Sequence, residues 1–294
     1  MAIVGPTASG KSALALELAD ELGAEIVSVD SMQVYRGMNI GTAKPSAADQ
    51  ARVAHHLIDV VEPDEHFTVA ETQLLGRAAI AAATGPVIIA GGTGLAMRAI
   101  VDPLEFPGRD ARVRAELETL ELPVLQDRLL TIDGAAGETV DLANPRRVIR
   151  ALEIYAVTGL NPSRRAATAA AQAVREFEAY LPFQAVGLDP GDRLEARVVA
   201  RFDAMLQAGL LDEVNGLAEQ LGRTAAQAVG YKELLPVVAG DHTIEEGRRA
   251  AIAATMAVAA NQRTYFRRDP RIDWLEWDDD PDARLDRARQ ELEI

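Results

Sequence analysis

The chain of 294 residues contains no cysteine, which excludes disulfides, a thiol nucleophile and a cysteine-based zinc site. It also lacks a long hydrophobic run, because stretches such as Ala78–Ala83 and Val87–Ala90 are far too short to cross a bilayer. No charged segment followed by an apolar one opens the sequence, as a secretory signal would. Because 48% of the residues are hydrophobic and charges of both signs are mixed, we expect a soluble, globular, cytoplasmic protein without a membrane partner.

Basic residues are in deficit, with 30 Lys and Arg against 45 Asp and Glu and a net charge of −15. This balance argues weakly against a nucleic-acid partner, because neutralisation of phosphates drives such binding. Local fields can nevertheless oppose the global charge. The arginines gather in three groups: Arg109, Arg112 and Arg114; Arg146, Arg147 and Arg150; Arg267, Arg268 and Arg271. Each group taken alone is equally consistent with a basic binding surface and with a solvated helix face.

One segment near the N-terminus matches the phosphate-binding loop G-x-x-x-x-G-K-[ST]. A predicted strand over Met1–Val4 precedes it and a predicted helix over Ser12–Leu22 follows it. Glycines let successive backbone N–H groups point at one anion, and the helix N-terminus adds partial positive charge. Lys11 is then placed to reach the outer phosphates, and the Ser12 hydroxyl to ligate Mg²⁺. The loop consists of Gly5, Pro6, Thr7, Ala8, Ser9, Gly10, Lys11 and Ser12, and a glycine-rich turn without a ligand is the alternative.

Helix and strand patterns alternate over the first third of the chain, which predicts an α/β fold: a P-loop NTPase-like parallel sheet core. From Arg109 onward the pattern is helical, so we expect a helical insert before a return strand at Phe183–Leu188. The predicted domains are 1–108 for the first part of the core, 109–182 for the insert and 183–294 for the remainder. The other predicted strands are Ala2–Val4, Glu25–Val29 and Pro86–Ala90, and the predicted helices are Lys11–Leu22, Val69–Ala83, Arg112–Leu120, Val124–Leu130, Pro145–Val157, Ser163–Ala179, Arg193–Gln207, Leu211–Leu221, Ala226–Val238 and Ile244–Phe266.

Two further polar segments directly follow predicted strands. Asp30–Pro45 supplies a carboxylate and several polar side chains, and Gly91–Gly94 stands where ligands bind in open α/β sheets. Thr93 could hydrogen-bond a substrate there or simply form a tight strand-to-helix turn. A polyphosphate site beside a second polar site suggests group transfer from a phosphorylated donor.

The sequence resembles the tRNA dimethylallyltransferases, also called tRNA isopentenyltransferases. The resemblance rests on Gly5–Ser12 and Asp30–Pro45, and it continues through His55–Asp59, Gly91–Leu95, Asn144–Glu153, Arg201–Leu206 and Ala228–Glu233. These blocks span nearly the whole chain in the expected order. The bacterial type is implied, because the C-terminal zinc finger of eukaryotic members needs cysteine.

The resemblance implies transfer of a dimethylallyl group from dimethylallyl diphosphate to N6 of the adenine next to the tRNA anticodon (position 37), with release of diphosphate. Asp30 matches the carboxylate that accepts the N6 proton. Thr7 matches a residue near the bridging oxygen, and Arg201 matches an arginine of the diphosphate site. Mg²⁺ held by Ser12 would neutralise the rest of the developing charge.

The resemblance also implies an RNA-binding surface and an acceptor pocket, because the adenine must leave its stack to react. The residues expected to border the flipped base are Asp30, Ser31, Met32, Gln33 and Thr93. Those expected to hold the anticodon stem-loop are Arg114, Arg146, Arg147, Val148, Ile149 and Arg150. We expect His55 and His56 to be structural and the protein to be a monomer.

The chain departs from the family pattern in two places. Family members usually carry Tyr after Gly-Gly-Thr-Gly-Leu, where this sequence has Ala96, so stacking or packing area beside the base is expected to be lost. In the late helix an aromatic is replaced by Val258, and four usual cations are replaced by Met256, Ala257, Ala260 and Asn261. The reaction centre is untouched, but a weaker electrostatic grip on RNA is expected.

Two other functions remain open at this point. A small-molecule kinase also joins this loop to a short α/β core with a helical lid, and it would bind ATP as a nucleotide-binding protein. A non-catalytic RNA- or nucleotide-binding protein descended from the enzyme is the other alternative, favoured slightly by the absent cations.

Overall fold

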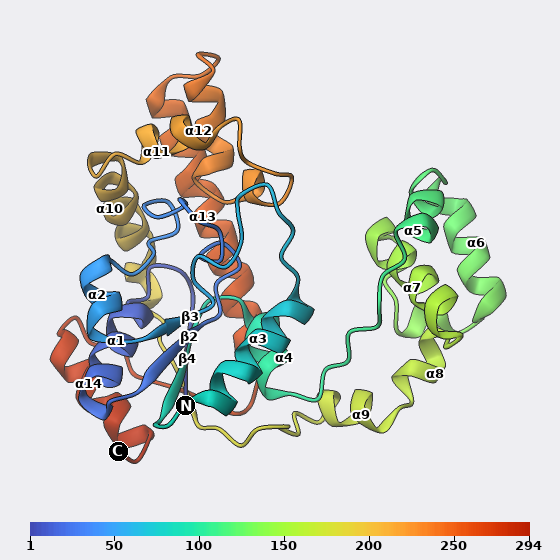
Figure 1. Ribbon diagram of the computed structural model, residues 1–294, viewed down its shortest axis with the longest axis horizontal. Helices are drawn as coiled ribbons and strands as arrows, with labels where there is room; N and C mark the ends of the chain where they lie inside the picture. The colour runs from blue at the N-terminus through green and yellow to red at the C-terminus, as the bar shows by residue number, and fades with distance from the viewer. The chain divides into compact units, whose positions relative to one another are not determined.

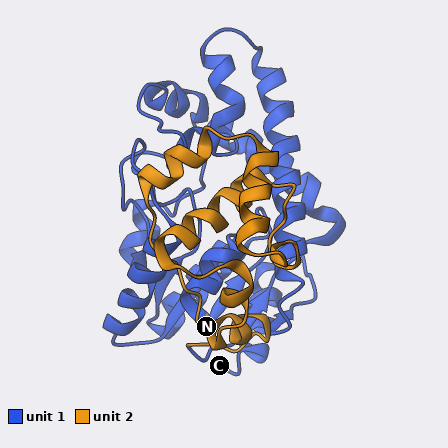
Figure 2. Ribbon diagram, turned by 90° about the vertical axis from the view of Figure 1, so that its right-hand side faces the viewer, with its two compact units in different colours: residues 1–101, 181–294 blue, residues 102–180 orange.

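The computed structural model describes residues 1–294 and divides them into two compact units (Figure 1). Unit 1 comprises residues 1–101 and 181–294, and unit 2 comprises residues 102–180 (Figure 2). The boundaries fall at 101/102 and 180/181, where the sequence placed them at 108/109 and 182/183. None of the helices combines the length and the apolar character that crossing a membrane demands.

Unit 1 is built on a six-stranded sheet in which every pairing is parallel, in the order β3-β2-β4-β1-β5-β6. The order of the strands in space differs from their order in sequence, so crossover helices connect them. The predicted parallel α/β core is confirmed. The strands are β1 (Ala2–Val4), β2 (Glu25–Ser28), β3 (His55–His56), β4 (Val87–Gly91), β5 (Ala185–Gly187) and β6 (Ile272–Trp274).

Alternate residues of the strands face two separate hydrophobic cores. On one face Ile3 and Ile88 pack with Leu18 of α1 (Lys11–Leu22) and with α14 (Pro281–Glu291). On the other face the core includes Val4 and residues of α3 (Val69–Ala82), α4 (Gly94–Val101) and α13 (Ile244–Phe266). Burial on both faces explains why these strands read as continuous apolar runs.

A third hydrophobic core in unit 1 packs the segment that follows β2 against helices from the C-terminal third of the chain. Tyr35 and Met38 are fully buried in it beside Tyr231 and Leu234. The cluster fixes the segment after β2, which carries the predicted site residues, against these helices. Helices of this part of the chain are α2 (Ala47–Arg52), α10 (Leu194–Gln207), α11 (Leu210–Leu217) and α12 (Tyr231–Val238).

Unit 2 has its own hydrophobic core and no strand, as the predicted helical insert requires. Leu125, Leu129 and Val148 form its fully or almost fully buried centre. Its helices are α5 (Ala111–Glu118), α6 (Leu122–Ile132), α7 (Pro145–Thr158), α8 (Pro162–Ala166) and α9 (Ala169–Arg175).

Two predicted helices are interrupted in the structure. The predicted helix Ser163–Ala179 is two short helices, because Thr168 caps the second by accepting the Ala171 N–H at 3.2 Å. The predicted helix Ala226–Val238 is a 3₁₀ turn (Ala225–Gln227) followed by α12. Gly230 separates them with φ of +95°, a conformation that a helix interior does not allow.

Candidate active site

The loops that follow β2, β4 and β1 meet at one edge of the sheet, because these strands are neighbours and parallel. They carry Asp30, Thr93 and the phosphate-binding loop respectively. Together with α10 and α13 they enclose a cavity of about 530 Å³. Its polar lining includes Thr7, Lys11, Ser12, Asp30, Gln33, Thr93, Arg201, Gln227, Asn261 and Gln262.

The phosphate-binding loop has the backbone that an anion site needs. Ala8 and Gly10 have φ of +61° and +90°, so the chain turns tightly before α1 begins at Lys11. A Cβ on Gly5 would lie 2.2 Å from the Leu188 carbonyl oxygen, so only glycine fits there. The Ser9 hydroxyl is fully buried and lacks a hydrogen-bond partner, so it can donate to an oxygen of a bound anion.

Two cations stand in this cavity without a carboxylate at ion-pair distance. The Lys11 ammonium donates to the Pro6 carbonyl oxygen at 3.1 Å, and the Arg201 guanidinium donates to the Thr7 hydroxyl at 3.0 Å. Burial and the nearby charge of Arg201 lower the pKa of Lys11, Asp30 opposes both effects, and the resulting pKa is about 8. Burial likewise lowers the pKa of Arg201. Buried cations without counter-ions favour an anionic ligand.

Asp30 lies just after β2. It closes a turn of its own loop and interacts electrostatically with the cations of the cavity. Its Oδ1 accepts the Met32 N–H at 2.9 Å, which closes a turn and fixes the carboxylate. The carboxylate also interacts with the charges of Lys11 and Arg201. Ser31 and Met32 line the cavity beside it. The capping contact and a role as a base are compatible, because they use different oxygens.

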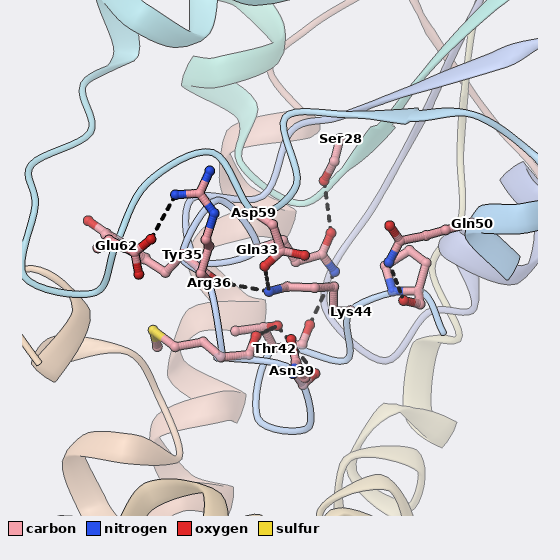
Figure 3. A network of polar contacts seen from close by, with 12 residues as sticks. Ser28, Gln33, Tyr35, Arg36, Asn39, Thr42, Lys44, Gln50, Asp59 and Glu62 are labelled. Carbon is pink, nitrogen blue, oxygen red and sulfur yellow. Dashed lines mark hydrogen bonds and ion pairs between the residues drawn. The ribbon is translucent and has the colours of Figure 1, made fainter. Parts of the chain in front are cut away.

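Gln33 is buried, and both ends of its amide are engaged by the protein. Its Oε1 accepts from the Ser28 hydroxyl at 2.9 Å, and its Nε2 donates to the carbonyl oxygens of Thr42 and Ala43 at 3.2 and 3.3 Å. Figure 3 shows this network continuing to Lys44, which binds Asp59 Oδ1 at 2.6 Å. Gln33 thus ties the segment after β2 to the loop over 39–44.

Thr93 directly precedes α4, and its carbonyl oxygen accepts the N–H groups of Ala96 and Met97. It lines the cavity, so both interpretations of Thr93 remain compatible with its position. Ala96 lies elsewhere: it is 5% exposed and packs in the core on the sheet, not in the cavity. Ala96 itself therefore does not border the cavity, and the expected loss of stacking or packing area beside the base stays a prediction. Leu95 is the neighbour that reaches the cavity.

Helix α13 closes the site from the far end of the sequence. Gln262 Oε1 accepts the Thr7 N–H at 2.8 Å, which fastens the helix to the phosphate-binding loop. Tyr265 packs so closely on Gly94 that a Cβ there would lie 2.1 Å from the ring. Gln262 was not among the predicted site residues, because the spacing of residues along the sequence does not reveal its contact with the phosphate-binding loop.

The replaced positions of α13 have different environments. Val258 and Asn261 line the cavity, whereas Met256 packs against the small core that contains Ala8. Ala257 and Ala260 are exposed. Of these four positions, only Asn261 lines the cavity.

A second cavity of about 560 Å³ lies beside the first and shares Lys11, Ser12 and Arg201 with it. Its third cation is Arg197, which donates Nε to the Ala8 carbonyl oxygen at 2.7 Å. Arg197 stacks over Trp277, with its guanidinium carbon 5.0 Å from the ring centroid. No carboxylate lines this second cavity, whereas Asp30 lines the first beside Lys11 and Arg201, so cations outnumber carboxylates in both.

In unit 2 the predicted RNA-binding residues fall into three kinds: buried apolar residues, arginines near a buried carboxylate, and exposed arginines. Val148 and Ile149 are 0% and 8% exposed in the core, so their side chains cannot reach an RNA and that expectation needs correction. Arg114 and Arg150 instead approach the buried carboxylate of Glu153, at 3.6 and 2.7 Å. Arg146 and Arg147 are exposed, as are Arg109, Arg112, Arg128, Arg164 and Arg175 elsewhere in unit 2.

The fold and the site together define a P-loop α/β protein with an electropositive cavity at the carboxyl edge of its sheet. A family model described as "IPP transferase" matches residues 33–269. The chain belongs to this family. It is 42% identical to the tRNA dimethylallyltransferase of Nocardioides sp., covering 95% of this chain and 91% of that protein. It is 44% identical to the one from Acidothermus cellulolyticus, covering 97% and 90%.

Solved structures agree with this assignment. The chain is similar to the tRNA isopentenylpyrophosphate transferase of Bacillus halodurans, with 35% identity, a TM-score of 0.71 and coverage of 98% of this chain and 93% of that one. A eukaryotic dimethylallyltransferase acting on tRNA shares the fold with a TM-score of 0.81 at 24% identity, covering 96% and 76%.

Proposed function

We propose that this protein transfers a dimethylallyl group from dimethylallyl diphosphate to N6 of the adenine next to the anticodon of a tRNA. Membership of the family supports the reaction class. The observation that carries the proposal is the meeting of Asp30 with two unpaired cations, Lys11 and Arg201, in one cavity.

The donor's diphosphate would bind at the phosphate-binding loop. Lys11, Arg201 and the N-terminus of α1 place positive charge where the leaving group gains negative charge, which stabilises the transition state. The Ser9 hydroxyl and the Thr7 side chain are further polar groups of this loop. The apolar walls of the cavity, including Met32, Phe202 and Met205, suit the dimethylallyl chain.

Mg²⁺ fits this loop through a hydroxyl rather than a carboxylate cluster. Ser12 is exposed to both cavities, and the structure has no group of three or more His, Cys, Asp or Glu side chains that could hold a metal. Ser12 and the diphosphate oxygens would therefore hold the ion, as Mg²⁺ commonly combines few protein ligands with substrate phosphates and water. When bound, it neutralises charge on the diphosphate.

The transfer step forms a bond between N6 and the terminal allylic carbon and breaks the bond between that carbon and the diphosphate oxygen. The electron pair of the broken bond leaves with diphosphate. The proton lost from N6 passes to the Asp30 carboxylate, whose position is fixed by the Met32 N–H. Gln33 and Thr93 would shape the wall against which the flipped adenine lies.

The anticodon stem-loop would bind unit 2 through its exposed arginines. Arg146 and Arg147 in the first turn of α7 extend side chains that make no ion pair in the structure. Such side chains bind phosphates at little cost in lost internal contacts. The cavity is lined within one unit of one chain, so we propose that a cytoplasmic monomer is active.

The test is mass spectrometry of an anticodon stem-loop incubated with the protein, dimethylallyl diphosphate and Mg²⁺. We expect an adenosine that gains one dimethylallyl group, with release of one diphosphate. Binding of the stem-loop without product at saturating donor would support the non-catalytic alternative instead. ATP γ-phosphate transfer to a small acceptor, without prenylated RNA, would support the kinase.

A further inference from the structure

Glu213 on α11 is the centre of a hydrogen-bond cluster outside both cavities. Its carboxylate accepts three consecutive backbone N–H groups of the loop over 39–41. Oε2 accepts from Asn39 at 3.0 Å and from Ile40 at 2.8 Å, and Oε1 accepts from Gly41 at 3.0 Å. Successive N–H groups that converge on one anion fix the backbone of the loop that carries them.

Tyr231 at the start of α12 completes the cluster. Its hydroxyl donates to Glu213 Oε1 at 2.5 Å, and the side chain is fully buried. Its ring lies against Gly41, where a Cβ would be 2.4 Å from the nearest ring carbon. The loop is therefore held by a carboxylate through its N–H groups and by an aromatic ring through van der Waals contact.

The held loop forms part of the site. Gly41, Thr42 and Ala43 line the first cavity, and Ile40 and Ala43 line the second. The carbonyl oxygens of Thr42 and Ala43 also accept from Gln33 Nε2, as Figure 3 shows for Thr42. Neither Glu213 nor Tyr231 lines a cavity, so they act on a substrate indirectly, and this loop is the neighbour that both of them hold.

We propose that Glu213 and Tyr231 are positioning residues that set the loop over 39–43, and through it Gln33, as the acceptor-side wall of the active site. The inference rests on the proposed function only for the identity of the acceptor. The phosphate-binding loop makes no hydrogen bond to Glu213 or Tyr231, so we expect diphosphate binding to depend on them far less than acceptor placement does.

Two variants test the proposal. Glu213→Gln replaces one acceptor oxygen by an NH₂ group that faces backbone N–H groups, and Tyr231→Phe removes only the hydroxyl. Asp212→Asn is the matched control, because it removes a charge from the next residue of α11, which is exposed. The measurements are amide hydrogen exchange of residues 39–41, binding of inorganic diphosphate, and kcat/KM for the stem-loop.

For Glu213→Gln we expect amide exchange at 39–41 to accelerate about tenfold or more, because these N–H groups lose an acceptor. The value of kcat/KM for the stem-loop should fall at least about tenfold, since a displaced wall misplaces the acceptor. Diphosphate affinity should stay within about twofold, as should all three quantities in Asp212→Asn. Tyr231→Phe should give a smaller change in the same direction.

Unchanged amide exchange and kcat/KM in Glu213→Gln would overturn the proposal. A parallel loss of diphosphate affinity would also overturn it, because it would show a general structural role. A wild-type protein that produces no prenylated RNA would contradict the proposed function, whereas the exchange measurement would still decide whether Glu213 holds the loop.

Discussion

At the scale of single residues, the candidate site depends on charges that the fold buries without neutralising them. Lys11 is only 8% exposed, and its ammonium contacts a carbonyl oxygen rather than a carboxylate. Arg201 is anchored to the Thr7 hydroxyl in the same way. Each cation raises the cost of keeping the other charged, and an anionic ligand would relieve both.

The lowered pKa of Lys11 gives a pH dependence with a defined sign. Because the pKa in the free site is about 8, roughly nine-tenths of the sites carry the charge at pH 7 and progressively fewer above pH 8. We therefore expect donor affinity to fall as pH rises through 8. The diphosphate of the donor also titrates, so the variant Lys11→Arg serves as the control. Its guanidinium stays charged, and its donor affinity should not fall in this pH range for want of the Lys11 charge. Parallel profiles for the two proteins would contradict the assignment.

The exposed arginines of α7 make a prediction about RNA binding. Replacing both Arg146 and Arg147 by Ala should reduce the slope of log affinity against log salt by roughly one and a half, as for two lost phosphate contacts. Arg128→Ala is the control, because Arg128 already pairs with Glu116 at 3.3 Å. Stem-loop binding measured across a salt series tests this. A slope equal to that of wild type would place the RNA elsewhere.

The residues that the sequence could predict are those in short, spaced motifs. The phosphate-binding loop and Asp30 lie where strand ends of a parallel sheet must meet. The sequence did not distinguish Val148 and Ile149 from their arginine neighbours by role, although they occupy the buried face of an amphipathic helix. Gln262 and Glu213 act across more than 170 residues, so only the packing of late helices reveals them.

At the scale of elements, the long helix α13 from the C-terminal part of the chain contacts the phosphate-binding loop at its N-terminal end. It supplies an acceptor for the Thr7 N–H through Gln262 and packs Tyr265 on Gly94. Its N-terminus is secured by a capping box between Thr243 and Glu246. The geometry of the phosphate-binding loop thus depends on a helix that begins more than 200 residues later.

Gly92→Ala tests that dependence. The new Cβ would lie 2.4 Å from Gln262 Nε2, so the amide of Gln262 must shift, which disturbs its hydrogen bond with the Thr7 N–H. Loss of one hydrogen bond of about 1 kcal/mol should weaken diphosphate binding by several-fold, measured by calorimetry.

Gly216→Ala on α11 is the matched control, because nothing lies within 4 Å of its Cβ. It should stabilise the helix by about 0.5–1 kcal/mol and leave diphosphate binding unchanged. Equal diphosphate affinities for Gly92→Ala and Gly216→Ala would show that α13 does not set the loop.

Elements with strong periodicity were predictable to within a few residues, and short or interrupted ones were not. The two-residue strand β3 and the edge strand β6 escaped prediction, because their pairing rather than their sequence defines them. Helix α14 was also missed, although Asp280 and Pro281 form a recognisable start signal. Gly230 marks a break only because its φ is positive, which the sequence alone does not reveal.

At the scale of the whole molecule, the helical insert enters and leaves unit 1 at one place. The Leu181 N–H donates to the Val101 carbonyl oxygen at 3.1 Å, so the two ends of the interruption are adjacent. Each unit has its own hydrophobic core. The donor cavity belongs entirely to unit 1, and the exposed arginines of α7 belong to unit 2.

Excision of residues 102–180 and closure with a short Gly/Ser linker should therefore leave a folded unit 1. We expect this protein to bind diphosphate within a few-fold of wild type. Its affinity for the stem-loop should fall at least about tenfold, because the phosphate contacts that we propose for unit 2 would be lost. Calorimetry with diphosphate and with the stem-loop measures the two affinities. A folded unit 1 with undiminished affinity for the stem-loop would contradict the assignment of RNA binding to unit 2.

In the proposed reaction Asp30 accepts the proton that N6 of the adenine loses. The most direct measurement is the single-turnover rate of prenylation of a bound stem-loop by wild type and by Asp30→Asn, at saturating dimethylallyl diphosphate and Mg²⁺. Asn keeps an oxygen for the Met32 N–H, so the turn persists. We predict a rate about 10²–10⁴-fold lower for Asp30→Asn with both substrates still bound. An equal rate in the two proteins would show that Asp30 is not the group that accepts the proton.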